Sequence, residues 1–160
     1  MILFQAGRQA MKVRLLWMAW VIATVSLAGA TLYLMARVVG APDAGLALGR
    51  LQLFATLTAI AVAGSAGLGI YVRVYVTRIA LEDGDTILIS TLGWVREQTT
   101  RLDPSRVEDT GFHEWSTRTV DAPWWTIWLR GRYFPLIVDA QGDVSDLPRL
   151  LEALARASRN

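Results

Sequence analysis

Few residues of this 160-residue chain are of the types that carry out chemistry, and they are scattered. His113 is the single histidine, and with Glu114 it suggests one corner of a metal site, although a lone histidine in a polar segment is more commonly solvated. Asp83 and Asp85 flank a glycine, a spacing that fits a tight turn better than paired acid–base catalysis. Cysteine is absent, which excludes disulfides and thiolate chemistry. We therefore predict that the protein is not an enzyme and has no catalytic residue, metal site or cofactor.

A tryptophan cluster is the strongest candidate for a contact surface. Trp124, Trp125 and Trp128 lie within five positions, next to Arg130 and Arg132. In a strand, Trp124 and Trp128 share one face and Trp125 lies on the other. One face is expected to fill the core, and a small sheet cannot easily bury both, so the other is predicted to contact a protein partner or lipid headgroups. The two arginines would contact phosphates or carboxylates at a hairpin tip, with a solvated turn as the alternative.

Two apolar stretches without charges, residues 15–36 and 53–72, precede the tryptophan cluster and are expected to position it. At about 1.5 Å per helical residue, each is long enough to cross a hydrocarbon core of about 30 Å. A cleaved signal peptide is the alternative for the first stretch, but its apolar character continues beyond the small residues at 28–30 that would form a cleavage site. The predicted order is an N-terminal segment at 1–14, a transmembrane helix at 15–37, an extracytoplasmic loop at 38–50, a second transmembrane helix at 51–73 and a cytoplasmic β-rich domain at 74–160.

Basic residues near the predicted spans indicate the orientation. Positive charges are more numerous beside the outer ends of the two spans than in the loop between them, which has only Arg37 and Arg50. The positive-inside rule then places both termini in the cytoplasm. All but one of the 16 basic residues are arginine, which we interpret as the mark of a GC-rich bacterial genome. The predicted location is the bacterial inner membrane.

Small residues recur at i, i+4 and i+8 along the second span, as Ala59, Ala63 and Gly67. Such a stripe lets another helix backbone approach closely inside lipid. Two interpretations remain open: the stripe packs the two spans against each other, or it faces a helix of a larger complex. Neither span contains a histidine or a carboxylate, so neither offers imidazole to a haem or a proton path.

The fold class predicted is α+β, with a transmembrane helical hairpin followed by a small antiparallel β domain. Beyond residue 73 the apolar period changes to two, as in strands. Residues 108–121 are polar and weakly patterned, which predicts a loop with at most one strand. The first four residues are either an amphipathic segment at the interface or a disordered start. The predicted strands and closing helix are a strand from residue 74 to about 79, strands at 86–90, 94–102, 125–129 and 133–138, and an amphipathic helix at 146–158.

Two families resemble this pattern. Residues 76–79 leading into an acidic glycine turn, the hairpin at 128–134, and 136–139 followed by Gly142 resemble the TMEM-type assembly-factor family of mitochondria and bacteria. Those small two-span proteins help to build ATP synthase, the proton-pumping NADH dehydrogenase and cytochrome oxidase. The layout is also similar to bacterial membrane-anchored pleckstrin-homology-like domains, a type that includes a photosynthetic reaction-centre assembly protein. Neither resemblance implies a catalytic residue.

The function expected from these features is that of a non-catalytic accessory or assembly subunit of a respiratory or photosynthetic membrane complex. Its partners would be a larger integral-membrane protein complex and the lipid bilayer, without a small-molecule substrate. The net charge of +2 is too small to indicate nucleic-acid binding. The alternative is a membrane-surface adaptor whose β domain binds anionic lipid or a soluble partner.

Overall fold

The computed structural model describes residues 1–38, 44–82, 86–116, 121–144 and 146. These residues form two compact units. One is a helical hairpin, Arg14–Ile70, and the other is a β domain that combines Met1–Val13 with the chain from Tyr71 onward. The α+β class, with two long apolar helices and antiparallel sheets, is confirmed. The N-terminal residues, predicted as a separate segment at 1–14, belong to the β domain.

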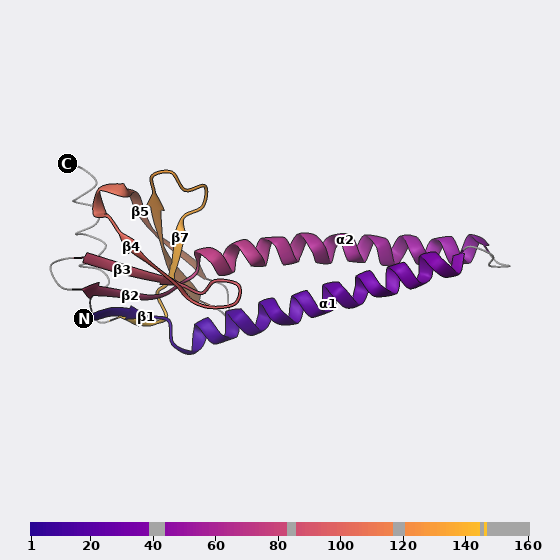
Figure 1. The fold of residues 1–160 in the computed structure, drawn as a ribbon, viewed down its shortest axis with the longest axis horizontal. Helices are drawn as coiled ribbons and strands as arrows, with labels where there is room; N and C mark the ends of the chain where they lie inside the picture. Colours follow the sequence, from indigo (N-terminus) through magenta and orange to yellow (C-terminus); the bar gives the residue numbers. More distant parts are fainter. Residues whose placement is uncertain (39–43, 83–85, 117–120, 145, 147–160) are drawn as a thin grey trace. The chain divides into compact units, whose positions relative to one another are not determined.

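Helix α1 runs over Arg8–Val38 and helix α2 over Ala44–Val74, and the two lie side by side in the hairpin (Figure 1). Both are long and apolar enough to span a membrane. The predicted loop at 38–50 is too long, because residues 44–50 are already helical. Leucine and alanine favour the helix strongly enough there to outweigh two glycines.

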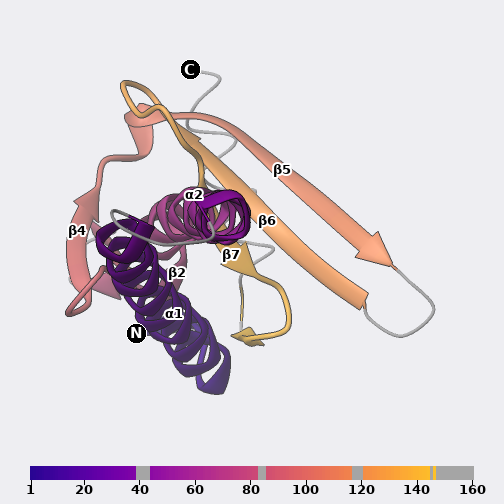
Figure 2. The same cartoon turned by 90° about the vertical axis from the view of Figure 1, so that its right-hand side faces the viewer.

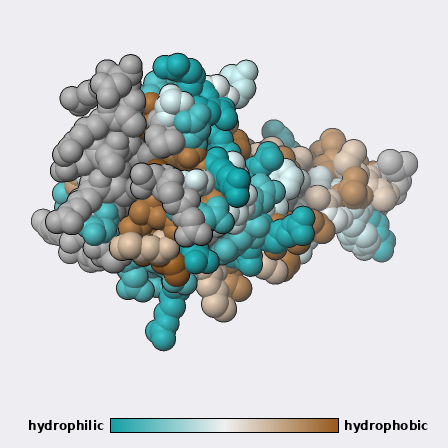
Figure 3. Space-filling view, turned by 60° about the vertical axis from the view of Figure 1, so that its left-hand side comes forward, coloured by the Kyte–Doolittle hydropathy of each residue, from teal (hydrophilic) through white to brown (hydrophobic). Residues whose placement is uncertain are grey.

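Polar contacts join the two helices of the hairpin. The hydroxyl oxygens of Thr24 and Ser65 are 2.8 Å apart, and the indole N–H of Trp20 donates to the carbonyl of Ala61 at 2.9 Å. A methyl group added at Gly64 would collide with the Trp20 ring, so this position requires glycine. Most large apolar side chains of the hairpin point outward, and brown and tan surface recurs along its visible face (Figure 3).

The larger sheet has five strands in the order β4-β3-β2-β1-β8. Strands β2 and β3 lie close to the strands predicted at 74–79 and 86–90. The strand bounds are β1 Ile2–Gln5, β2 Val76–Glu82, β3 Thr86–Thr91, β4 Gln98–Leu102 and β8 Asp143–Val144. The predicted strand at 94–102 begins four residues late, since residues 94–97 are irregular.

Strand β1 replaces both structures expected for the first four residues. It pairs antiparallel with β2 on one side (Figure 1) and with β8 on the other. Leu3 and Phe4 are adjacent yet both buried, because the register shifts between Ile2 and Phe4. Phe4 packs so closely over Gly142 that a side chain there would meet its ring. This shift removes the alternation by which a strand is recognised in sequence.

The smaller sheet has three strands, β5 Val107–Ser116, β6 Asp121–Leu129 and β7 Leu136–Asp139. A 3-10 turn at Pro104–Arg106 precedes it. Strands β5 and β6 form a long antiparallel pair (Figure 2). For residues 108–121 the prediction was a loop with at most one strand; β5 is such a strand, and it covers most of the segment. Only Val107 of β5 is buried, so the strand carries no apolar alternation.

The core of the β domain lies where β2 and β7 approach each other. Tyr75, just before β2, forms a parallel bridge with Ile137 of β7. Tyr75, Val76, Ile79, Ile127 and Val138 are almost fully buried. Of the closing helix predicted at 146–158, only Asp146 falls within the described residues.

Candidate functional site

The register of the smaller sheet gathers one set of side chains on one face. Trp124 of β6 lies opposite His113 of β5 and opposite Asp139 of β7. Trp115 lies opposite Ala122, two residues further along the same pair of strands. Residues directly opposite each other in an antiparallel pair share a face, so these five side chains point the same way.

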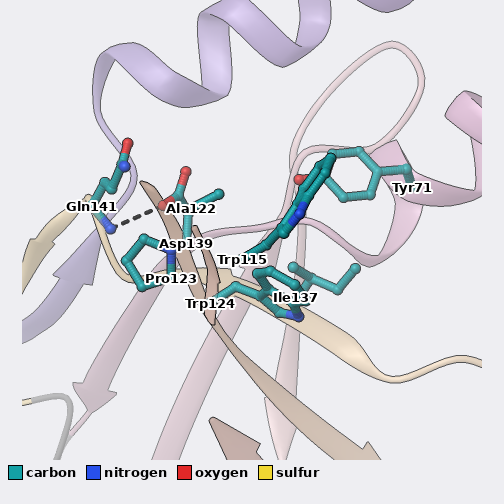
Figure 4. A pocket seen from close by; sticks show the side chains of 8 residues that line it. All are labelled: Tyr71, Trp115, Ala122, Pro123, Trp124, Ile137, Asp139 and Gln141. Carbon is teal, nitrogen blue, oxygen red and sulfur yellow. Dashed lines mark hydrogen bonds between the residues drawn. The ribbon is translucent and has the colours of Figure 1, made fainter. Parts of the chain in front are cut away.

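A pocket of about 500 Å³ opens on this face (Figure 4). Three aromatic rings, from the end of α2, from β5 and from β6, line this space, and the carboxylate of Asp139 lines it on the side of Ala122 and Gln141 (Figure 4). The lining residues are Tyr71, Trp115, Ala122, Pro123, Trp124, Ile137, Asp139 and Gln141. Trp115 is 67% exposed, so the pocket has a large aromatic side chain on its rim.

Two hydrogen bonds hold the carboxylate of Asp139. Its Oδ1 accepts the backbone N–H of Gln141 at 2.9 Å, and its Oδ2 accepts the hydroxyl of Tyr75 at 3.3 Å. Burial, and then the negative charge of Asp139, raise the pKa of the Tyr75 hydroxyl well above its usual value, so this hydroxyl stays protonated and remains a donor. Within the described ranges, no lysine or arginine forms an ion pair with Asp139.

His113 supports the pocket from the side of β5. Its ring stacks on Trp124 with centroids 5.5 Å apart, and its Nε2 lies 3.1 Å from the hydroxyl oxygen of Thr126. That hydroxyl also lies 3.3 Å from the carbonyl of Gly111. These contacts fix the orientation of the Trp124 ring. Among the residues that the structure describes, no three histidine, cysteine, aspartate or glutamate side chains group together as metal ligands would.

The other predicted tryptophans lie outside the pocket. Trp125 is half-buried on the opposite face, with its ring centroid 4.8 Å from that of Phe112. Trp128 is 40% exposed beside Glu108 and Asp109. The expectation that one face of β6 fills the core and the other contacts a protein partner or lipid headgroups is too simple. Burial changes along β6 instead, with Thr126 and Ile127 buried and the positions on either side of them more open.

Arg130 and Arg132 lie in the turn that follows β6, as expected, and both residues are exposed. The backbone N–H of Arg130 donates to the carbonyl of Arg106 at 2.8 Å, and the Arg106 guanidinium donates back to the carbonyl of Arg130 at 3.2 Å. Gly131, between Arg130 and Arg132, has a φ of 82°, in the left-handed region that favours glycine.

The small-residue stripe on α2 lies on the outside of the hairpin. Ala59, Ala63 and Gly67 are all exposed, and a methyl group added at Gly67 would meet nothing within 4 Å. The contact between the helices uses other positions of α2, including Gly64 and Ser65. Of the two interpretations that the sequence left open, packing within the hairpin is therefore not the role of this stripe.

The sequence predicted none of Tyr71, Trp115 and Asp139 as a site residue; Tyr71 was placed only near the end of the second predicted span, where interfacial aromatics occur. Recognising 107–116 as a strand antiparallel to β6 would have placed Trp115 beside Trp124. Asp139 binds the backbone of the turn that follows β7 as well as lining the pocket.

Comparisons of the chain with protein-family models, with curated proteins and with solved structures find no match. The two family resemblances remain predictions, and the function has to be argued from geometry.

Proposed function

We propose that the protein is a membrane-anchored accessory or assembly subunit that docks on a larger integral-membrane protein complex through α2. The outward position of Ala59, Ala63 and Gly67 carries this proposal. In lipid, large side chains gain nothing by facing a partner instead of acyl chains, whereas small residues gain close backbone packing. A stripe that the hairpin itself does not use is therefore available to a helix of another protein.

The pairing of β1 with β2 supports a hairpin that crosses the membrane twice. Strand β1 ends three residues before α1 begins, and β2 begins two residues after α2 ends. The chain therefore leaves one sheet and returns to it, so two crossings leave both termini on one side. The greater number of basic residues near these ends supports the cytoplasmic side of a bacterial inner membrane.

A photo-reactive amino acid at position 63, in the full-length chain in native membranes, tests the docking. Position 62 is the matched control, because Val62 is also exposed on α2 but lies about 100° away around the helix axis. We expect an adduct with an integral-membrane protein from position 63 and none from position 62. Equal adducts from both positions, or adducts with a second copy of this chain alone, would contradict the proposal.

A larger side chain at one position of the small-residue stripe gives an independent test of the docking. Gly67→Leu should reduce recovery of the cross-linked partner in mild detergent by about tenfold, since it separates the two backbones. Val62→Leu adds one methylene group off the stripe and should leave recovery unchanged. Equal recovery with both variants would contradict docking through this stripe.

A further inference from the structure

The pocket on the smaller sheet combines three aromatic rings with one carboxylate. Tyr71, Trp115 and Trp124 supply the rings, and Asp139 supplies the charge. The face of an aromatic ring carries negative potential and attracts a cation that lies within about 6 Å of its centre. Quaternary and primary ammonium groups suit such a site, because they combine apolar surface with a positive charge.

The carboxylate is held ready for a cation. Each oxygen of Asp139 accepts one hydrogen bond, from Tyr75 or from Gln141, and a carboxylate has about four lone-pair positions. Both partners are neutral donors, so they orient the charge without cancelling it. Arg73 is close to Tyr71 in sequence, but its guanidinium lies over the ring of Trp94, at 5.0 Å from the centroid.

The size and access of the pocket fit a small ligand. Its volume of about 500 Å³ falls within the range of small-molecule sites, about 300 to 1,000 Å³. The exposed ring of Trp115 forms part of the wall (Figure 4). A large aromatic side chain that is 67% exposed gains little from the protein core, and it gains contact area when a ligand lies against it.

We propose that this pocket binds an alkylammonium group, with the cation against the rings of Tyr71, Trp115 and Trp124 and paired with Asp139. The source that we favour is the choline or ethanolamine headgroup of a phospholipid, a choice that rests on the proposed membrane anchoring. Tyr71 lies in the last turn of α2, three residues before Val74, and the end of a spanning helix lies at headgroup depth. A soluble amine shares the same chemistry.

Titration of the full-length protein in maltoside micelles tests the ammonium site. Choline is the probe, and its uncharged carbon isostere, 3,3-dimethylbutan-1-ol, is the matched control. We expect choline to shift the indole N–H resonances of Trp115 and Trp124, assigned from single Trp→Phe variants, and the isostere to bind about tenfold more weakly. Equal binding of the two probes would overturn the proposal, because the pocket would then be merely apolar. Absence of any shift with choline would overturn it as well.

Single substitutions test which pocket residues contribute to choline binding without disturbing the fold. Asp139→Asn should weaken choline binding severalfold, whereas Tyr75→Phe removes one hydrogen bond to the carboxylate but keeps the charge and should weaken it less. Trp115→Leu should also weaken binding, and it should fold normally since Trp115 is mostly exposed. Trp128→Leu on the same sheet, outside the pocket, should bind choline as the parent does. Unchanged binding in Asp139→Asn and Trp115→Leu would overturn the assignment of these residues.

Lipid nanodiscs distinguish the two sources. In discs of phosphatidylcholine or phosphatidylethanolamine the headgroup should occupy the pocket, so added choline should shift the resonances far less than in discs of phosphatidylglycerol. Equal shifts in all discs would indicate a soluble amine as the ligand. Docking through Ala63 is measured separately, so either proposal can fail while the other stands.

Discussion

The hairpin and the β domain are stabilised in opposite ways. Within the described residues, Ala61 is the only apolar side chain of the hairpin Arg14–Ile70 that is buried, whereas the β domain buries a contiguous apolar core that includes Phe4, Ile79, Ile127 and Val138. Polar contacts and a glycine join the hairpin helices, while most of their apolar surface faces outward. The β domain supplies its own apolar surroundings, whereas the hairpin leaves most of its large apolar side chains exposed.

Phe4→Ala should have the largest effect, because it removes a fully buried ring from the core of the β domain. We expect a loss of about 3–5 kcal/mol in the free energy of unfolding. The measurement is the thermal midpoint of the full-length protein in detergent, followed by near-ultraviolet circular dichroism. Ile2→Ala in the same strand is the control, since Ile2 is 45% exposed and should lower the midpoint much less. Equal midpoints would show that β1 adds little to the core.

Gly64→Leu should disrupt the hairpin by about 1–3 kcal/mol, since the new side chain collides with Trp20. Because the chain has no cysteine, disulfide formation between Thr24→Cys and Ser65→Cys can report the helix contact. We expect the extent of cross-linking to fall in Gly64→Leu and to stay the same in Gly67→Leu, whose position is open. Equal loss in both would contradict the assignment of inner and outer faces.

Thr24→Val should have the smallest effect, about 0.6 kcal/mol and at most about 1.7 kcal/mol, because hydrogen bonds between helices in lipid are individually weak. Thr24 shares a hydrogen bond with Ser65 across the hairpin, whereas Thr56 bonds only to its own helix, at the carbonyl of Gln52. The free energy of detergent-induced unfolding is measured for Thr24→Val, for Ser65→Ala and for the double variant. This double-mutant cycle should show an interaction energy between positions 24 and 65. A similar coupling for Thr56→Val would contradict the interhelical bond.

The sequence was most informative where structure is local. The hairpin follows from runs of apolar residues, and β2 with β3 follows from an alternating pattern interrupted by an acidic, glycine-containing sequence. Strand β1 escaped prediction because it is four residues long and pairs with residues about 75 positions away. Strand β5 was allowed for, but its bounds were not predicted, because it is exposed along almost its whole length and burial imposes no pattern on it.

The candidate pocket could be predicted only in part. Trp124 stood out because tryptophans are rare and clustered there. Tyr71, Trp115 and Asp139 lie on three other elements, and only the pairing of β5 with β6 and of β6 with β7 brings the strand residues together.

The position of β1 has a consequence for the order in which the protein is made. Strand β1 precedes both helices in the chain, so its partner β2 is synthesised only after them, and at about 5–20 residues per second this takes several seconds. Until then Leu3 and Phe4 have no strand to cover them. The β domain can therefore close only on a chain whose second helix has already been synthesised.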